Sequence, residues 1–192
     1  MKNGLILVGG GGHCKACIDV IEQDGTYGIA GIIDVPEKLG TEVLGYEVVG
    51  TDNDLPRLVK EYDMLITIGQ IRNPKNRIRL FENIKGLGGR LPVIVSPLAH
   101  VSKHARVGQG TIVMHKAMIN AGAAIGDNCI INTMSLIEHD AIVGDHCHVA
   151  SGALINGNCC LGNEVFVGSN AVLKNGISVP SETIISAGKF VR

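Results

Sequence analysis

The chain has 192 residues, of which 45% are hydrophobic and 18% charged, so it can bury a packed core and disorder is not expected. Its net charge of −1 argues against a nucleic-acid-binding protein that works through an excess of Lys and Arg. The sequence has no apolar run long enough for a membrane span, and its apolar start is too short for a signal peptide, so a cytoplasmic protein is expected.

The first half of the chain alternates between strand and helix patterns. This alternation predicts an α/β domain over residues 1–96, with a small, Rossmann-like parallel sheet of about four strands. The predicted strands are 4–9, 29–33, 64–68 and 93–95, and the predicted helices are 14–23, 52–60 and 73–84.

A run of four glycines and His13 follows the first predicted strand and opens the first predicted helix. Such a loop turns backbone N–H groups and a helix N-terminus toward a phosphate. Asp34 and Gly69 end the next two strands, and open parallel sheets bind ligands at these carboxyl ends. Cys14 replaces the third glycine of the dinucleotide fingerprint, so a tight turn without a ligand is the alternative.

Basic residues after Gly69 are candidates for binding phosphate charge, with a solvated helix face as the alternative reading. They are Arg72, Lys75, Arg77 and Arg79.

The second half of the chain repeats every six residues. Each unit has one branched aliphatic residue, and the residue two positions before it is small in most units. This period is typical of a parallel β-helix, in which three units close a triangular coil of 18 residues. It predicts a second domain over residues 97–192. The aliphatic positions are Val101, Val107, Val113, Ile119, Ile125, Ile131, Ile137, Val143, Val149, Ile155, Leu161, Val167, Leu173, Val179, Ile185 and Val191.

Cys129, Cys147 and Cys159 occupy small inward positions of this repeat. Cys129 and Cys147 are 18 residues apart, so we expect them to stack in one buried column as small hydrophobes. Cys14 and Cys17 lack a second pair, which favours two helical residues over a redox or zinc site. In a cytoplasmic protein the six cysteines are expected to be reduced.

One histidine of the repeat stands between two carboxylates, in Glu138-His139-Asp140. Neighbouring carboxylates can orient an imidazole and stabilise its charged form, as a general base requires. Gly157 follows His139 by 18 residues and is therefore expected one coil above it, about 5 Å away. Its N–H could there receive the oxyanion of a tetrahedral intermediate. An exposed histidine without a catalytic role is the alternative.

Together these segments resemble a family of hexapeptide-repeat acetyltransferases. The family includes bacterial sialic acid O-acetyltransferases and nucleotide-linked 4-amino-sugar N-acetyltransferases, and the likeness covers nearly the whole chain. It implies that the β-helix is left-handed. The likeness rests on Val8-Gly9-Gly10-Gly11-Gly12-His13, Ile33-Asp34, Ile66-Thr67-Ile68-Gly69, Ile131-Asn132-Thr133 and Ile137-Glu138-His139-Asp140.

The resemblance also implies roles for individual residues. His139 would be the catalytic base, assisted by Asp140 and Glu138. Acetyl-CoA, the co-substrate, would be bound by His148, Gly157, Ser169 and Ala187, with His148 at the thioester. The sugar nucleotide would be bound by Gly11, Gly12, His13, Asp34 and Gly69.

The resemblance thus implies N-acetylation of the 4-amino group of a UDP- or GDP-linked 4-amino-4,6-dideoxy sugar. The product would serve glycan or nonulosonic acid biosynthesis. The enzyme would be a homotrimer and would use no metal. Sialic acid O-acetylation and a non-enzymatic nucleotide-binding scaffold are the alternatives. Two features depart from the family pattern. Val35 stands where many members carry a second acid, and the coenzyme-binding Gly-Val-Pro-Ala-Lys tail of many members has no counterpart.

Overall fold

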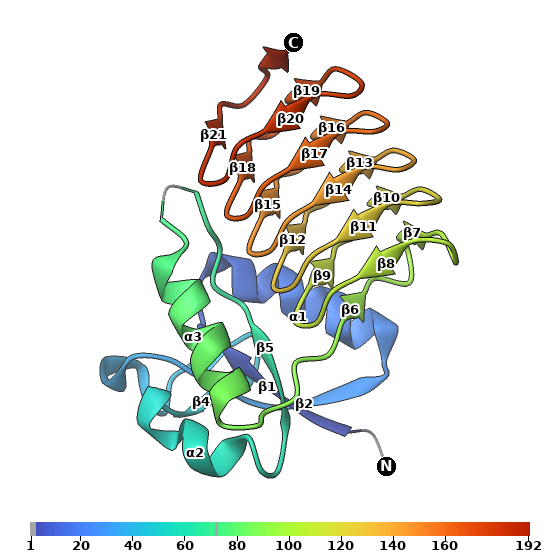
Figure 1. Ribbon diagram of the computed structural model, residues 1–192. Coiled ribbons are helices and arrows are strands. Elements are labelled where there is room, and N and C mark those ends of the chain that lie inside the picture. Colours follow the sequence, from blue (N-terminus) through green and yellow to red (C-terminus); the bar gives the residue numbers. More distant parts are fainter. Residues whose placement is uncertain (1–2, 72) are drawn as a thin grey trace. The chain divides into compact units, whose positions relative to one another are not determined.

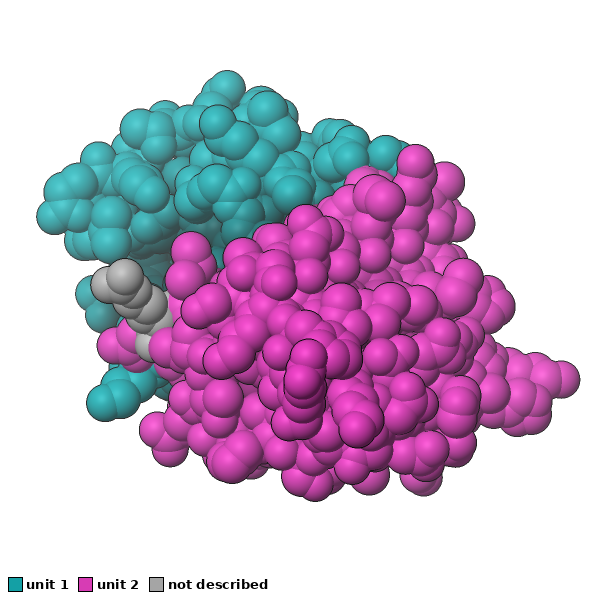
Figure 2. Space-filling view, turned by 90° about the horizontal axis from the view of Figure 1, so that it is seen from above, with its two compact units in different colours: residues 1–69, 75–92 teal, residues 70–74, 93–192 magenta. Residues whose placement is uncertain are grey.

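The computed structural model describes residues 3–71 and 73–192. The chain divides into two compact units, which Figure 2 shows in different colours. The first unit comprises residues 1–69 and 75–92, and the second comprises residues 70–74 and 93–192. No helix within the described ranges is long and apolar enough to cross a membrane.

The first unit is built on a five-stranded sheet in the order β3-β4-β2-β1-β5. β1 pairs in parallel with β2 and β5, and β2 pairs in parallel with β4, whereas β3 is antiparallel to β4. The strands are β1 (Asn3–Val8), β2 (Tyr27–Ile33), β3 (Glu42–Val43), β4 (Tyr46–Gly50) and β5 (Asp63–Ile66).

Helices cover both faces of this sheet. Ile6 and Val8 of β1 pack in one cluster with residues of α2 and α3. Leu5 and Leu7 alternate with them along the strand and are buried on the opposite face, which α1 covers (Figure 1). The helices are α1 (Gly12–Asp24), α2 (Leu55–Leu58) and α3 (Lys75–Gly86), with 3-10 turns η1 (Pro36–Lys38) and η2 (Asp52–Asp54).

The sheet differs from the expected four strands at both ends. The hairpin of β3 and β4 was not expected from the sequence. It turns at Leu44 and Gly45, both with positive φ, and its strands are short and partly exposed, so they carry little hydrophobic pattern. The strand expected at 93–95 is β6 (Ile94–Val95), and it pairs with the repeat rather than with this sheet.

The second unit is a parallel β-helix, as the six-residue register predicts (Figure 1). Two-residue strands from successive coils stack into three sheets. The first contains β22 (Phe190–Val191), β19 (Val172–Leu173), β16 (Leu154–Ile155), β13 (Leu136–Ile137), β10 (Met118–Ile119) and β7 (His100–Val101). The second contains β20 (Ser178–Val179), β17 (Cys160–Leu161), β14 (Ile142–Val143), β11 (Ala124–Ile125) and β8 (Arg106–Val107). The third contains β21 (Ile184–Ile185), β18 (Phe166–Val167), β15 (His148–Val149), β12 (Ile130–Ile131), β9 (Ile112–Val113) and β6.

The interior of the coils is filled by the two predicted registers of aliphatic and small residues. Cys129 and Cys147 are both fully buried in this core, which confirms their predicted inward position. Many corners turn at a non-glycine residue with positive φ, such as Asp140 and Asn158. Asp and Asn tolerate this region better than most residues, so the outward corners can carry polar side chains.

Candidate functional site

The glycine loop of the first unit is held tightly against the sheet. Gly9 N donates to Ile33 O at 2.8 Å, and Gly9 has a φ of +103°. A Cβ on Gly9 would lie 2.4 Å from Cγ1 of Ile68. Glycine is therefore required at this position by both its backbone conformation and the close approach.

The loop leads directly into the N-terminus of α1. Gly11 is the N-cap and offers no side-chain oxygen to the first helical N–H groups, and the first turn has no acidic residue. A Cβ on Gly11 or Gly12 would meet no atom within 4 Å, so both residues face open space. The positive end of the helix dipole therefore faces this open space and favours an anion there.

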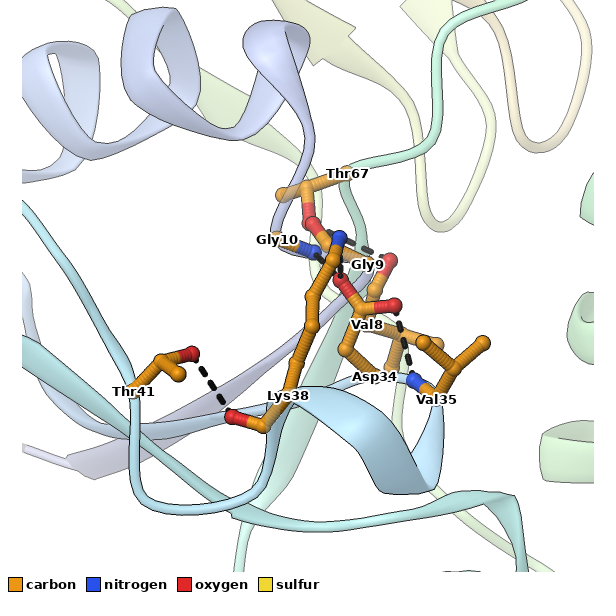
Figure 3. A network of polar contacts seen from close by, with 8 residues as sticks. All are labelled: Val8, Gly9, Gly10, Asp34, Val35, Lys38, Thr41 and Thr67. Atoms are coloured by element: carbon orange, nitrogen blue, oxygen red, sulfur yellow. Dashed lines mark hydrogen bonds and ion pairs between the residues drawn. The ribbon is translucent and has the colours of Figure 1, made fainter.

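Asp34, at the end of β2, anchors this loop (Figure 3). Its Oδ2 accepts from Gly10 N at 2.7 Å and from Lys38 Nζ at 2.8 Å, and its Oδ1 accepts from Val35 N at 2.8 Å. Burial disfavours the ionised carboxylate, but the hydrogen bonds from Lys38, Val35 and Gly10 outweigh burial and lower the pKa of Asp34. The carboxylate therefore fixes the loop as a charged group.

A pocket of about 430 Å³ lies at this carboxyl edge of the sheet. It brings together all five residues that the sequence suggested for the sugar nucleotide. It also includes Lys38, which the sequence did not single out, and Thr67, which stands in a family motif but was given no role. Lys38 follows Asp34 by four residues after a Pro-initiated turn, which was the available signal. The lining residues are Gly9, Gly11, Gly12, His13, Asp34, Lys38, Thr67, Ile68 and Gly69.

The basic residues after Gly69 are only partly associated with this edge. Arg79 lines an adjoining pocket of about 200 Å³ with Asp34, and it donates to Asp52 Oδ2 at 2.8 Å. Arg77 is buried and Lys75 is exposed. Arg72 lies outside the described residues.

The lowered pKa of Asp34 predicts a pH dependence of stability. A carboxyl group with a depressed folded-state pKa stabilises the protein above its ordinary value of 3.8, and this contribution is lost as the pH falls through the folded-state pKa. We expect Asp34→Asn to melt at a lower temperature than the wild type at neutral pH, and the difference to shrink below that value. Thermal unfolding of both proteins from about pH 6 to about pH 3 measures this. A constant difference would contradict it.

In the second unit, the corner after β13 presents His139 and Asp140. His139 Nδ1 lies 2.9 Å from Asp140 Oδ2. Because a carboxylate only accepts, Nδ1 carries the proton, and Nε2 of the neutral ring keeps its lone pair. Asp140 therefore sets the tautomer that a general base requires. The two side chains are 56% and 60% exposed, so the ring is accessible in the single chain.

Gly157 occupies the equivalent corner one coil further on, because β13 and β16 pair in register. A Cβ on Gly157 would lie 2.7 Å from both Cε1 and Nε2 of His139. The imidazole thus packs directly against the Gly157 backbone, with its unprotonated nitrogen on that side. Their positions one coil apart match the expectation from the 18-residue spacing.

Glu138 and His148 have partners of other kinds. Glu138 Oε2 accepts from Asn120 Nδ2 at 2.8 Å, one coil below. His148 is buried, and its Nδ1 donates to Gln70 O at 2.6 Å. Its Nε2 lies 3.2 Å from Nδ2 of Asn132, which can donate to it. The sequence had placed Asn132 in a family motif but had assigned it no role.

Ser169 and Ala187, suggested for the coenzyme, line one cleft of about 510 Å³. Gly168 and Ser186 lie beside them, and Phe166 and Ile184 supply apolar surface. A Cβ on Gly168 would lie 2.4 Å from Ala187 N, so the two corners approach closely. The cleft suits an extended ligand with both apolar and amide groups.

The cysteines do not form a reactive cluster. Cys14 and Cys17 are buried in α1, and burial is the main cause that raises the pKa of both thiols. Cys160 is exposed, and none of the six cysteines, all of them within the described ranges, is joined in a disulfide. Within the described ranges, no group of three or more His, Cys, Asp or Glu side chains is arranged to hold a metal ion.

Comparisons with known proteins extend over both units. Residues 4–84 match the family model of the PglD N-terminal domain, and residues 90–189 match that of the GMPPB C-terminal domain. No curated protein sequence matches the chain.

Solved structures cover the chain almost completely. The acetyltransferase domain of PglB from Neisseria gonorrhoeae is 32% identical with a TM-score of 0.90, over 97% of this chain and 90% of that one. PerB from Caulobacter crescentus, in complex with CoA and GDP-perosamine, is 33% identical with a TM-score of 0.90, over 99% and 89%. WeeI from Acinetobacter baumannii, at 20% identity and a TM-score of 0.76 over 96% and 93%, shares the fold. The chain therefore belongs to the hexapeptide-repeat acetyltransferase family that includes nucleotide-linked 4-amino-sugar N-acetyltransferases, and its repeat domain is a left-handed parallel β-helix.

Proposed function

We propose that this protein transfers an acetyl group from acetyl-CoA to the 4-amino group of a UDP- or GDP-linked 4-amino-4,6-dideoxy sugar. The observation that carries the proposal is the arrangement of His139, whose Nδ1 is held by Asp140 and whose Nε2 lies against Gly157. PerB, a whole-chain relative, binds both CoA and GDP-perosamine, an amino-sugar nucleotide. The product would serve glycan or nonulosonic acid biosynthesis.

His139 acts as the general base in this proposal. Its Nε2 accepts the proton that the sugar amine loses as the amine nitrogen bonds to the acetyl carbon. Asp140 stabilises the resulting imidazolium through the existing 2.9 Å contact. The Gly157 N–H stabilises negative charge on the acetyl oxygen. When the C–S bond breaks, the His139 imidazolium gives its proton to the sulfur, so that CoA departs as the thiol and the base is restored. Glu138, held by Asn120, adds negative charge beside the base.

The nucleotide part of the acceptor binds the pocket of the first unit. The N-terminus of α1 and the Gly11–His13 backbone favour a diphosphate. Lys38 lines the same pocket and adds positive charge, although Asp34 already balances part of it. Gly69 and Thr67 complete the edge at β5.

Acetyl-CoA binds the second unit through His148, Gly157, Ser169 and Ala187. The cleft beside Ser169 and Ala187 fits the pantetheine arm, because it combines apolar side chains with exposed corner backbone. His148 is held in one orientation by its two ring contacts, so it can define the wall at the thioester end.

The protein is proposed to act as a homotrimer. The outward side of the sheet that contains β13 carries a continuous apolar column, and its ends, Met118 and Phe190, are 43% and 52% exposed. Leu136, Leu154 and Val172 stack between them. A contiguous apolar stripe of this kind favours association. A cytoplasmic location is also proposed, because six cysteines without a disulfide among them suit a reducing compartment.

Acetyl transfer is tested by CoA release with UDP- and GDP-linked 4-amino-4,6-dideoxy sugars, including GDP-perosamine, followed by product analysis. We expect an amide at C4. An ester on a hydroxy sugar such as sialic acid, without amide formation, would instead indicate O-acetylation. Nucleotide binding without CoA release from any acceptor would indicate a non-enzymatic scaffold.

If the first unit binds the acceptor, Gly11→Val should weaken the affinity for the sugar nucleotide at least tenfold, on the order of 1.4 kcal/mol. The affinity for acetyl-CoA should be retained. Gly11 has φ −82° and ψ −168°, which valine can adopt, and its side chain would project into open space of the pocket. Calorimetric titration of each ligand measures the two affinities.

Gly86→Val is the matched control, because Gly86 also faces open space but lies outside the pocket. Its affinity for both ligands should equal that of the wild type. If Gly11→Val lowers the affinity for both ligands equally, the nucleotide site is misassigned.

A further inference from the structure

Hydrogen bonds between coils follow a regular ladder at the corner that carries the catalytic histidine. The residue after each strand of the β13 sheet donates its backbone N–H to the coil above. Glu138 N donates to Ile155 O at 2.9 Å, and Lys174 N donates to Val191 O at 3.0 Å. This bond fixes the direction of the peptide unit that enters the corner.

The coil between these two makes the bond differently. At Asn156 the donor is the side-chain amide, whose Nδ2 lies 2.7 Å from Leu173 O. In the other described coils of residues 93–192, the carbonyl equivalent to Leu173 O accepts from a backbone N–H of the coil below. The side chain of Asn156 has therefore taken the place that its own backbone N–H would occupy.

The exception falls at the reacting corner. The peptide unit after Asn156 contains the N–H of Gly157, and the His139 ring packs against the same glycine. A hydrogen bond from the backbone N–H of Asn156 would fix the backbone at that position. Because the side chain makes the bond instead, the peptide unit between Asn156 and Gly157 can take another orientation. The contact to Leu173 O then holds that orientation, because Asn156 is partly buried and its amide has a fixed acceptor.

We propose that Asn156 is a positioning residue. Its side-chain bond to Leu173 O replaces the ladder bond and so sets the orientation of the Gly157 N–H relative to His139. The inference rests on the proposed acetyl transfer, in which that N–H stabilises the developing oxyanion. A donor that exists only to meet charge in the transition state acts on kcat rather than on substrate binding.

The kinetic test is Asn156→Ala. Without the side-chain donor, the backbone N–H at position 156 can rejoin the ladder and turn the next peptide unit. We expect kcat to fall about 10- to 100-fold, because small misplacements of a catalytic group have effects of this size. The KM values for acetyl-CoA and for the best amino-sugar nucleotide should stay within about twofold, since uniform binding is untouched.

Asn163→Ala is the matched control. Asn163 Oδ1 accepts from Asp145 N at 2.9 Å, which is also a side-chain bond between coils, but at a different corner. Removing it should leave kcat unchanged even if the melting temperature falls. Equal losses of kcat in both variants would show that Asn156 merely stabilises the β-helix.

Amide hydrogen exchange tests the same inference without relying on activity, and its wild-type comparison needs no variant. In the wild-type protein the amide at Asn156 should exchange faster than those of Glu138 and Lys174, and Asn156→Ala should slow exchange at position 156. Equal protection of the three wild-type amides would overturn the inference. So would wild-type kcat in Asn156→Ala, and that result would leave the proposed acetyl transfer standing.

Discussion

His139→Ala is expected to lower kcat by about 10²- to 10⁴-fold, the usual contribution of a general base, with little change in acetyl-CoA affinity. The ring supplies the lone pair of Nε2. In the proposed function the coenzyme binds chiefly along the cleft beside Ser169 and Ala187, which the substitution does not touch. Asp140→Asn should lose less activity, because it weakens the orientation of the base without removing it. Steady-state kinetics on an amino-sugar nucleotide, with coenzyme binding measured by calorimetry, tests both variants.

His104→Ala provides the matched control for this substitution. His104 is exposed at a corner of the same β-helix. Its backbone N–H donates to Ser102 Oγ at 3.2 Å, and its carbonyl accepts from Gly122 N at 3.2 Å, so both bonds survive the substitution. Its kcat should equal that of the wild type. Retention of wild-type kcat by His139→Ala at saturating substrates would refute the mechanism, whichever acceptor is used.

Gly157→Ala is expected to reduce kcat by about 10²-fold although it adds only one methyl group. That methyl would lie 2.7 Å from Cε1 and Nε2 of His139, so the ring must move. The ring can move at little cost because it is exposed, so the protein should fold, but the contact to Asp140 is lost or lengthened. The backbone N–H at position 157 remains, which separates displacement of the base from loss of the oxyanion donor.

A double-mutant cycle identifies the cause of this loss. If the added methyl acts by displacing the imidazole, then combining Gly157→Ala with His139→Ala should be no slower than His139→Ala alone. If the kcat losses of the two single variants multiply in the double variant, position 157 acts independently of the histidine. The KM for acetyl-CoA in the single variant shows whether the methyl also blocks the coenzyme.

Much of this architecture is readable from the sequence because the repeat has a fixed period. The alternation of large and small residues predicts the buried column of Cys129 and Cys147, and the 18-residue spacing predicts that Gly157 stacks next to His139. In a solenoid, a position in the sequence specifies a position in space. The glycine loop and Asp34 are similarly predictable, since the ends of parallel strands meet at one edge.

Other features depend on contacts that no local pattern encodes. Lys38 is bound to Asp34 only because η1 turns the chain back after Pro36. The corner position of Asn156 carries different residue types in neighbouring coils, such as Glu138 and Lys174, so its bond has no signature in the repeat. The hairpin of β3 and β4 lies at a sheet edge, where burial imposes little periodicity.

The pairing of β13 with β16 makes chain length itself a constraint on this enzyme. His139 and Gly157 face each other because one full circuit separates them, and Asn120 reaches Glu138 over the same interval. Inserting or deleting a single residue anywhere in that circuit would rotate one partner away while leaving every side chain chemically intact. Homologous chains should therefore vary freely in composition along the exposed corners of these coils, yet keep the count of residues between the base and its glycine unchanged.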